Sequence, residues 1–133
     1  MDYTHLLKDY HLKVTPQRLA IVEELYQHGH MNIDDLYHSL LQKFPSISLA
    51  TIYKNVNAMI EKVFLNEVKI PNQKVVYELT KEEHAHVVCQ ECQAIMDISI
   101  DTSALFVEAK KLSGYTITES SLVFAGTCPS CTK

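Results

Sequence analysis

The segment that decides how this chain folds sets two histidines before two cysteines: His84-Ala85-His86-Val87-Val88-Cys89-Gln90-Glu91-Cys92. A second cysteine pair lies near the end of the sequence, in Cys128-Pro129-Ser130-Cys131. Two cysteines separated by two residues can bind one ion from a tight turn, and two such turns complete the tetrahedron that zinc prefers. We therefore expect a structural zinc that supports folding and does no chemistry. Its ligands would be Cys89, Cys92, Cys128 and Cys131.

Two other uses of these cysteines stay open, namely a pair of disulfides and a redox-active thiol pair. Disulfides belong to oxidising compartments, and no apolar signal peptide opens the sequence, so we expect a reducing cytoplasm where thiols stay free. A redox Cys-x-x-Cys of the thioredoxin type usually stands alone, whereas two such pairs occur here. Zinc is therefore favoured, and the histidines at 84 and 86 are left for another role.

Composition limits the possible functions. The chain has 133 residues, 47% of them hydrophobic, without an apolar run long enough to span a membrane. Its formal net charge is −4; divided after Leu79, the first part carries eight Lys and Arg against nine Asp and Glu, and the second carries four against seven. Because nucleic-acid-binding domains are usually basic, DNA binding here would have to rest on a locally placed set of cations.

Three helices and a hairpin are predicted in the first part of the chain, residues 1–79. Residues up to about 14 form a short helix or arm, and Thr15 then caps a helix with proline at its first position. Asn32 caps the next helix, and Ser48 caps a third. The apolar stripe that we expect this third helix to bury consists of Ile52, Val56, Met59, Ile60 and Val63.

Two extended segments, residues 64–70 and 74–79, follow around a Pro-Asn-Gln turn and predict a hairpin. Three helices followed by a hairpin are typical of a winged helix, in which the third helix enters the major groove of DNA. The polar face of that helix would contact DNA through Thr51, Tyr53, Lys54 and Asn55. Scaffolds and protein-binding modules share this outline, so a zinc-stabilised adaptor that binds no DNA stays possible.

A polar hinge is predicted at residues 80–83, followed by a small domain at residues 84–133. Strands are expected at 86–89, 95–100 and 115–124, with a helix between the last two. A domain this small has little core, so zinc and a partner subunit would both help it fold. The predicted fold class is α+β: an N-terminal winged helix followed by a small α/β dimerisation domain with a zinc site.

A second group of potential ligands consists of His30, Glu78, His84, His86 and Asp97. Histidines 84 and 86 lie near the start of a strand, where alternate side chains point to one side. Imidazoles and carboxylates without thiolates suit Fe²⁺ or Mn²⁺. Two alternatives remain: solvated surface residues, and the facial triad of a non-haem iron enzyme. Against the enzyme, neither a glycine-rich cosubstrate loop nor a basic anchor for an oxo-acid is apparent.

The combination of LKVTPQR at 12–18, SLATIYK at 48–54 and the segment 84–92 with its final Cys-x-x-Cys resembles the ferric uptake regulator family. The resemblance spans essentially the whole chain. It implies a cytoplasmic, homodimeric, metal-dependent transcriptional repressor that binds a palindromic DNA operator, with no membrane or small organic substrate as partner. It also implies zinc on the four cysteines and a regulatory iron or manganese on His30, Glu78, His84, His86 and Asp97. By the same resemblance, Lys13 and Arg18 approach the minor groove and backbone of DNA.

Within this family, the ligand pattern is closest to the peroxide-stress regulators. Aspartate at position 97 resembles the peroxide-stress members, whereas iron-uptake members usually carry glutamate there. Glu78 favours the iron-uptake members instead, because the peroxide sensors commonly have aspartate at that position. The flanking Glu83 and Ala85 indicate that an additional metal site of the iron- and zinc-uptake members is degraded. We favour sensing of peroxide through metal-catalysed oxidation of His30 or His84. Iron uptake comes next, and zinc or manganese regulation last.

Overall fold

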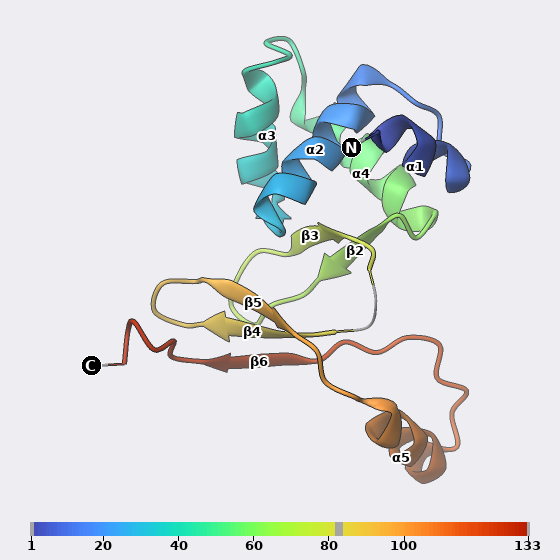
Figure 1. The fold of residues 1–133 in the computed structure, drawn as a ribbon, viewed down its shortest axis with the longest axis vertical. Helices are drawn as coiled ribbons and strands as arrows, with labels where there is room; N and C mark the ends of the chain where they lie inside the picture. Colours follow the sequence, from blue (N-terminus) through green and yellow to red (C-terminus); the bar gives the residue numbers. More distant parts are fainter. Residues whose placement is uncertain (1, 82–83, 133) are drawn as a thin grey trace. The chain divides into compact units, whose positions relative to one another are not determined.

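A computed structural model describes residues 2–81 and 84–132 of the chain (Figure 1). The chain divides into two compact units, residues 1–81 and 82–133. Of the predicted hinge at 80–83, positions 82 and 83 lie outside the described residues, and so does the Glu83 position considered above.

The described part of the first unit, residues 2–81, contains four helices, and each of them starts at a local sequence signal. Their bounds are α1 Tyr3–Asp9, α2 Pro16–His28, α3 Ile33–Leu41 and α4 Leu49–Glu61. The side chains of Thr15, Asn32 and Ser48 accept hydrogen bonds from backbone N–H groups in the first turns of α2, α3 and α4, at 3.2, 2.8 and 3.1 Å. The three predicted helix starts are therefore confirmed.

A three-stranded sheet in the order β1-β3-β2 completes this unit. Its strands are β1 Met31–Asn32, β2 Leu65–Val68 and β3 Val76–Leu79, all paired antiparallel. The predicted hairpin is thus confirmed with shorter strands, whereas the two-residue β1 was not predicted. Because Met31 pairs with Tyr77 in an antiparallel register, the ladder brings His30 next to Glu78.

The core of the first unit lies between its helices and the sheet. Helix α4 buries Ile52, Val56 and Met59. The predicted stripe is wrong in one position, because Val63 is 59% exposed. The helix ends at Glu61, and Val63 lies beyond it in the left-handed region with φ 61°. The change of backbone direction after Glu61 therefore takes Val63 out of the buried stripe that a continuous helix would have placed it in.

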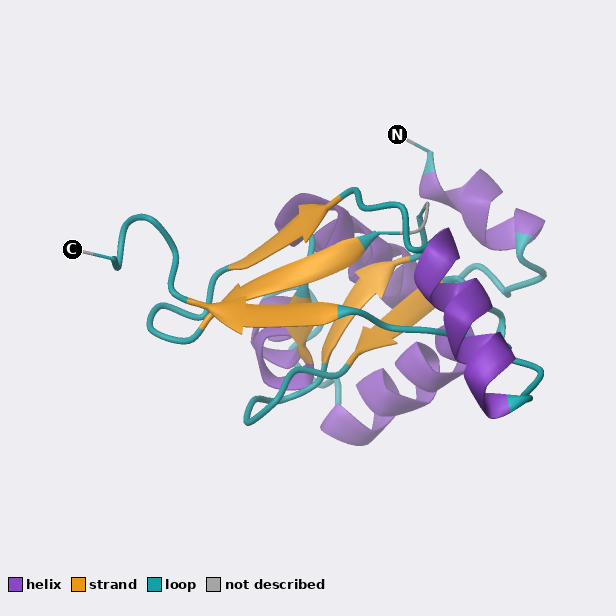
Figure 2. Ribbon diagram, turned by 90° about the horizontal axis from the view of Figure 1, so that it is seen from below, coloured by secondary structure: helices purple, strands orange, loops and turns teal. Residues whose placement is uncertain are grey.

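Residues 84–132 of the second unit form a three-stranded sheet in the order β5-β4-β6, and its strands lie side by side in both ribbon views (Figure 1, Figure 2). The strands are β4 Ala85–Cys89, β5 Ile95–Ile98 and β6 Val123–Gly126. Strand β4 pairs antiparallel with β5 and parallel with β6. The predicted strand at 115–124 is wrong for residues 115–122. Pairing with β4 begins at Val123, and a strand needs a hydrogen-bonded neighbour.

Helix α5, Ser103–Ser113, ends at Gly114, which adopts the left-handed conformation that the predicted helix end requires. None of its residues is buried, and Figure 1 shows it (brown) apart from the strands of its own unit. Among residues 2–81 and 84–132, no helix is both long and apolar enough to cross a membrane.

Candidate metal centres and nucleic-acid interface

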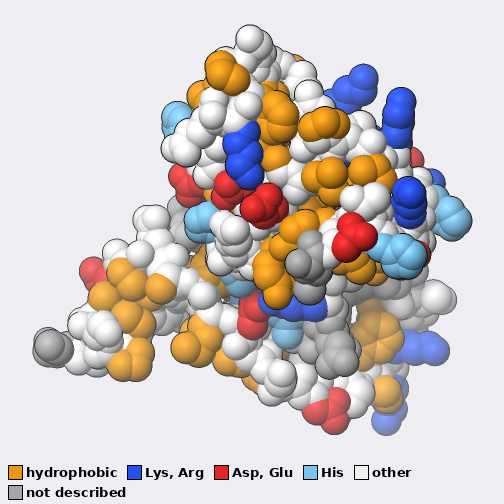
Figure 3. All heavy atoms as spheres, turned by 45° about the horizontal axis from the view of Figure 1, so that its top comes forward, with side chains coloured by type: hydrophobic (Ala, Val, Ile, Leu, Met, Phe, Trp, Pro, Cys, Tyr) orange, Lys and Arg blue, Asp and Glu red, His pale blue; other side chains and the backbone are white. Residues whose placement is uncertain are grey.

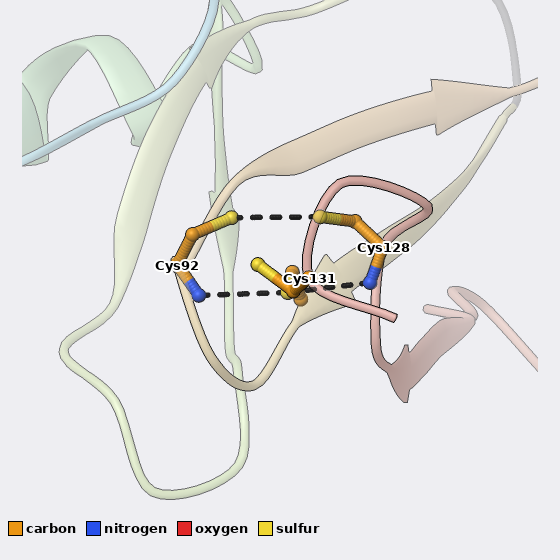
Figure 4. A group of neighbouring side chains, drawn as sticks. Cys92, Cys128 and Cys131 are labelled. Carbon is orange, nitrogen blue, oxygen red and sulfur yellow. Dashed lines mark hydrogen bonds between the residues drawn. The ribbon is translucent and has the colours of Figure 1, made fainter. Parts of the chain in front are cut away.

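The four cysteines lie together at one end of the second sheet. Strand β4 ends at Cys89, which pairs with Gly126 of the parallel strand β6, so both cysteine pairs follow neighbouring strands. All four sulfurs lie within 4.8 Å of one another. The sulfurs of Cys92 and Cys128 are 3.8 Å apart and point toward each other, with Cys131 beside them (Figure 4). Sulfurs bound at about 2.3 Å to one tetrahedral ion lie about 3.8 Å apart, so the spacing fits zinc.

Backbone hydrogen bonds prepare this cluster for a cation. The N–H groups of Cys92 and Cys128 donate to the sulfur of Cys89 at 3.5 and 3.4 Å. These bonds lower the pKa of Cys89 to about 6, which favours its thiolate, whereas the neighbouring Cys128 raises the pKa of Cys131 to about 12. One thiolate is thus stabilised by the protein itself, and further negative charge on the cluster requires a positive ion.

The predicted regulatory ligands of the first unit lie in contact with each other as a pair. The Nε2 atom of His30 lies 3.0 Å from an oxygen of Glu78, and their side chains are only 10% and 2% exposed. His30 follows the end of α2, and Glu78 lies in β3. The unpredicted strand β1 explains this proximity, because it aligns the two positions across the sheet.

The predicted regulatory ligands of the second unit form a trio. His86 in β4 pairs with Asp97 in β5, and His84 lies two residues before His86. The Nε2 atoms of the two histidines are 3.0 Å apart, and they lie 3.7 Å (His84) and 3.4 Å (His86) from one oxygen of Asp97. Two imidazole nitrogens and a carboxylate oxygen that converge in this way are a donor set suited to Fe²⁺ or Mn²⁺.

The predicted DNA-contacting residues of α4 differ in their surroundings. Tyr53 is 40% exposed, and Lys54 is exposed as well. Thr51 and Asn55 are half-buried and bonded locally: the Thr51 hydroxyl lies 2.9 Å from that of Ser48, and the Asn55 amide donates to the Thr51 carbonyl at 3.1 Å. The two exposed side chains are therefore the better placed to reach DNA.

Arg18 joins two parts of the first unit that lie far apart in the sequence. Its Nε–H donates to the Asn55 side-chain oxygen at 3.0 Å, and its Nη1 donates to the Lys13 carbonyl at 3.0 Å. We call these two hydrogen bonds the Arg18 bridge. No local sequence signal predicts it, because Arg18 and Asn55 are 37 positions apart. Elsewhere, Figure 3 shows Lys and Arg side chains scattered over the visible face and not gathered in one patch.

The model of the ferric uptake regulator family matches residues 9–125 of the chain. The chain belongs to the ferric uptake regulator family. The peroxide operon regulator of Bacillus subtilis is 30% identical over 129 residues, covering 96% of this chain and 89% of that protein.

Two solved structures of this family are similar over nearly the whole chain. The Campylobacter jejuni peroxide stress regulator is 38% identical with a TM-score of 0.73, covering 98% of this chain and 100% of that one. The Vibrio cholerae ferric uptake regulator is 31% identical with a TM-score of 0.75, covering 96% and 100%. The predicted family and its α+β fold class are confirmed. The chain is a metal-responsive transcriptional regulator, and its relatives include peroxide and iron regulators alike.

Proposed function

We propose that the chain is a dimeric, metal-dependent DNA-binding repressor that senses peroxide through oxidation of a ligand histidine. The observation that carries this proposal is the trio of His84, His86 and Asp97, whose donor atoms converge within 3.7 Å. The trio holds oxygen and nitrogen donors without thiolate, which suits a redox-active Fe²⁺ ion. Structural zinc on the four cysteines completes the proposed metal content.

The pair of His30 and Glu78 and the trio bind the same regulatory ion in this proposal. The pair alone offers a metal ion two ligand side chains, whereas the pair and the trio together offer five. Because the pair belongs to the first unit and the trio to the second, a shared ion fixes one unit against the other. In a symmetric dimer this sets the distance between two copies of α4, so metal and DNA strengthen each other's binding.

The histidines and the short carboxylate support our proposal of peroxide sensing. Fe²⁺ bound at such a site supplies one-electron chemistry with peroxide, which zinc cannot supply. The net change is that a ring carbon of His30 or His84 gains one oxygen atom, while the second oxygen of peroxide leaves as water. The altered imidazole is a poorer ligand, so the protein loses metal and then DNA. We infer this role, and not that of an enzyme with turnover.

The second copy in this dimer covers the exposed apolar side chains of α5. Leu105 and Leu112 are 60% and 78% exposed, and they lie seven positions apart on one face of the helix. Exposed apolar surface of this kind marks an interaction site, and a two-fold symmetric dimer buries the same patch on both copies.

The test of metal dependence is His30→Ala, with His28→Ala as the matched control because that imidazole is 53% exposed at the end of α2. The probe is a DNA duplex selected from a random library by the metal-loaded parent chain. His30→Ala should keep its zinc and its dimer but bind the duplex weakly at any Fe²⁺ or Mn²⁺ concentration. Parent-like affinity in His30→Ala would exclude the shared ion.

Asp97→Glu tests the peroxide response separately. A longer carboxylate can close over the ion or bind it through both oxygens, leaving less room for peroxide. The variant should stay a metal-dependent DNA binder yet release DNA much more slowly when peroxide is added. An iron-uptake regulator is the second candidate, favoured by Glu78 in β3. It would bind DNA according to Fe²⁺ concentration, and peroxide would leave the parent chain on its duplex.

A further inference from the structure

The Arg18 bridge uses only part of the hydrogen-bonding capacity of its guanidinium. An arginine side chain has five N–H donors arranged as a planar fork. The bridge occupies Nε–H and one N–H of Nη1, and within residues 2–81 and 84–132 the other three N–H groups, on the two Nη atoms, have no hydrogen-bond partner. Arg18 is half-buried, so its guanidinium is held in place by neighbours without being enclosed. Such a fixed fork matches the geometry of a phosphate.

Asn55 is occupied at both ends of its side-chain amide. Its oxygen accepts from Arg18 at 3.0 Å, and its nitrogen donates to the Thr51 carbonyl at 3.1 Å. An asparagine that reads adenine needs both its oxygen and its nitrogen directed at the base edge. Each bond uses one of the two hydrogen-bonding positions of its atom, and together they orient the amide toward Arg18 and the backbone of α4, although the position of Asn55 in α4 predicts a DNA contact.

We propose that Asn55 is a positioning residue: it holds Arg18 against α4 so that the free N–H groups of Arg18 bind a DNA phosphate. This rests on the proposed function, in which α4 enters the major groove. A phosphate bound by Arg18 then fixes the register of α4 on the duplex, and Tyr53 and Lys54 reach the bases from that register.

The second bond of the bridge extends the same role to the segment before α2. Arg18 binds the Lys13 carbonyl, while the neighbouring Leu12 is buried at 7% exposure. Lys13 itself is exposed. The bridge therefore joins the two parts of the unit that are predicted to contact DNA, the arm and the recognition helix. Losing it loosens the arm as well as Arg18.

The free protein offers the first test, by NMR of the arginine Nε–H resonances in the zinc-loaded chain. Arg18 should give a resonance that exchanges slowly with water in the parent chain and rapidly in Asn55→Ala. Asn57→Ala is the matched control, because it removes an exposed asparagine from the same helix and changes helix propensity equally. A slowly exchanging Arg18 resonance that persists in Asn55→Ala overturns the inference.

A double-mutant cycle of affinity for the selected duplex gives the second test. Asn55→Ala and Arg18→Ala should each weaken binding about tenfold, and Arg18→Ala should lower the salt slope by about one. Because Asn55 acts through Arg18, the double variant should bind like Arg18→Ala alone. Additive losses would mean that Asn55 contacts DNA itself, which overturns the inference alone. A parent chain that selects no duplex with metal overturns the proposed function and this inference together.

Discussion

The two units of this chain are stabilised in different ways. Every residue of the main buried cluster, from Leu7 to Tyr77, belongs to residues 1–81. In residues 84–132, by contrast, the buried side chains are Ala85, His86, Val88 and Cys89, and α5 buries none. Burial of apolar surface is the main favourable term in folding. The first unit therefore has a core of its own, whereas for the second we propose support from zinc on its four sulfurs and from a second copy.

This contrast matches the different tasks that we propose for the two units. The winged-helix unit must present α4 with a fixed geometry, which a packed core provides. In our proposal the second unit responds to metal, because the stability of a domain held by metal ligands changes when the metal is lost. We expect loss of zinc to have the largest effect, followed by truncation of the core and disruption of the dimer contact. Relief of a local backbone strain should have the smallest effect.

Loss of zinc should have the largest effect. Cys92→Ser removes one of four ligands, and a structural zinc contributes about 10 kcal/mol or more to folding. The variant should lose zinc and its dimer, while the NMR signals of residues 2–81 stay dispersed. Ser130→Ala, an exposed change within the second cysteine pair, is the control and should keep full zinc. A folded Cys92→Ser dimer that retains full zinc would refute the assignment.

Core truncation should act on the first unit alone. Leu36 is fully buried in α3, so Leu36→Ala should cost about 2 to 5 kcal/mol of its free energy of unfolding. Chemical denaturation monitored by NMR would measure this loss of stability, because the chain has no tryptophan whose fluorescence could be followed. Zinc content should be unchanged. Simultaneous loss of zinc in Leu36→Ala would mean that the two units fold as one and that the contrast is wrong.

The dimer contact should have a smaller effect. Leu112→Asp places a charge where the second copy is proposed to pack, and it should weaken the dimer at least tenfold. The neighbouring Lys111→Ala serves as control. Sedimentation velocity over a range of protein concentrations would detect the shift to monomer. If Leu112→Asp dimerises like the parent chain, another surface joins the copies.

The smallest effect concerns Val63, a β-branched residue with φ 61°. Left-handed backbone costs such a residue about 1 to 2 kcal/mol, and glycine avoids most of that cost. Val63→Gly should raise the melting temperature of the first unit by about 4 to 8 °C. Val63→Ala retains a Cβ atom and should give little of this gain, so an equal rise in both variants would point to a cause other than strain.

Local signals in the sequence predicted the helix starts and the hairpin, because each is specified by neighbouring residues, whereas the cysteine cluster was predicted from the ligand type and spacing of two pairs that lie far apart in the sequence. Thr15, Asn32 and Ser48 cap their helices as expected. Features that depend on distant partners could not be predicted in this way. Strand β1 exists because it pairs with β3, and β6 begins only where β4 offers a partner.

The same distinction between local signals and distant partners applies to the candidate sites. Ligand type and spacing indicated two kinds of metal centre before any geometry was known. Spacing could not predict that His30 lies 3.0 Å from Glu78, because an unpredicted strand sets that distance. Nor could it predict that Asn55 bonds to Arg18, since the two residues are 37 positions apart and meet only in the folded unit. Whether the pair and the trio share one ion stays a proposal.

Mass spectrometry after peroxide treatment tests the central claim most directly. The chain is purified without oxygen, loaded with Fe²⁺, exposed to peroxide and digested. We predict one added oxygen on the peptide that carries His30 or the peptide that carries His84, together with release from the duplex. Protein loaded with redox-inert zinc should gain none. An iron-loaded chain that gains no oxygen and stays bound to DNA would contradict peroxide sensing and leave the iron-uptake regulator in its place.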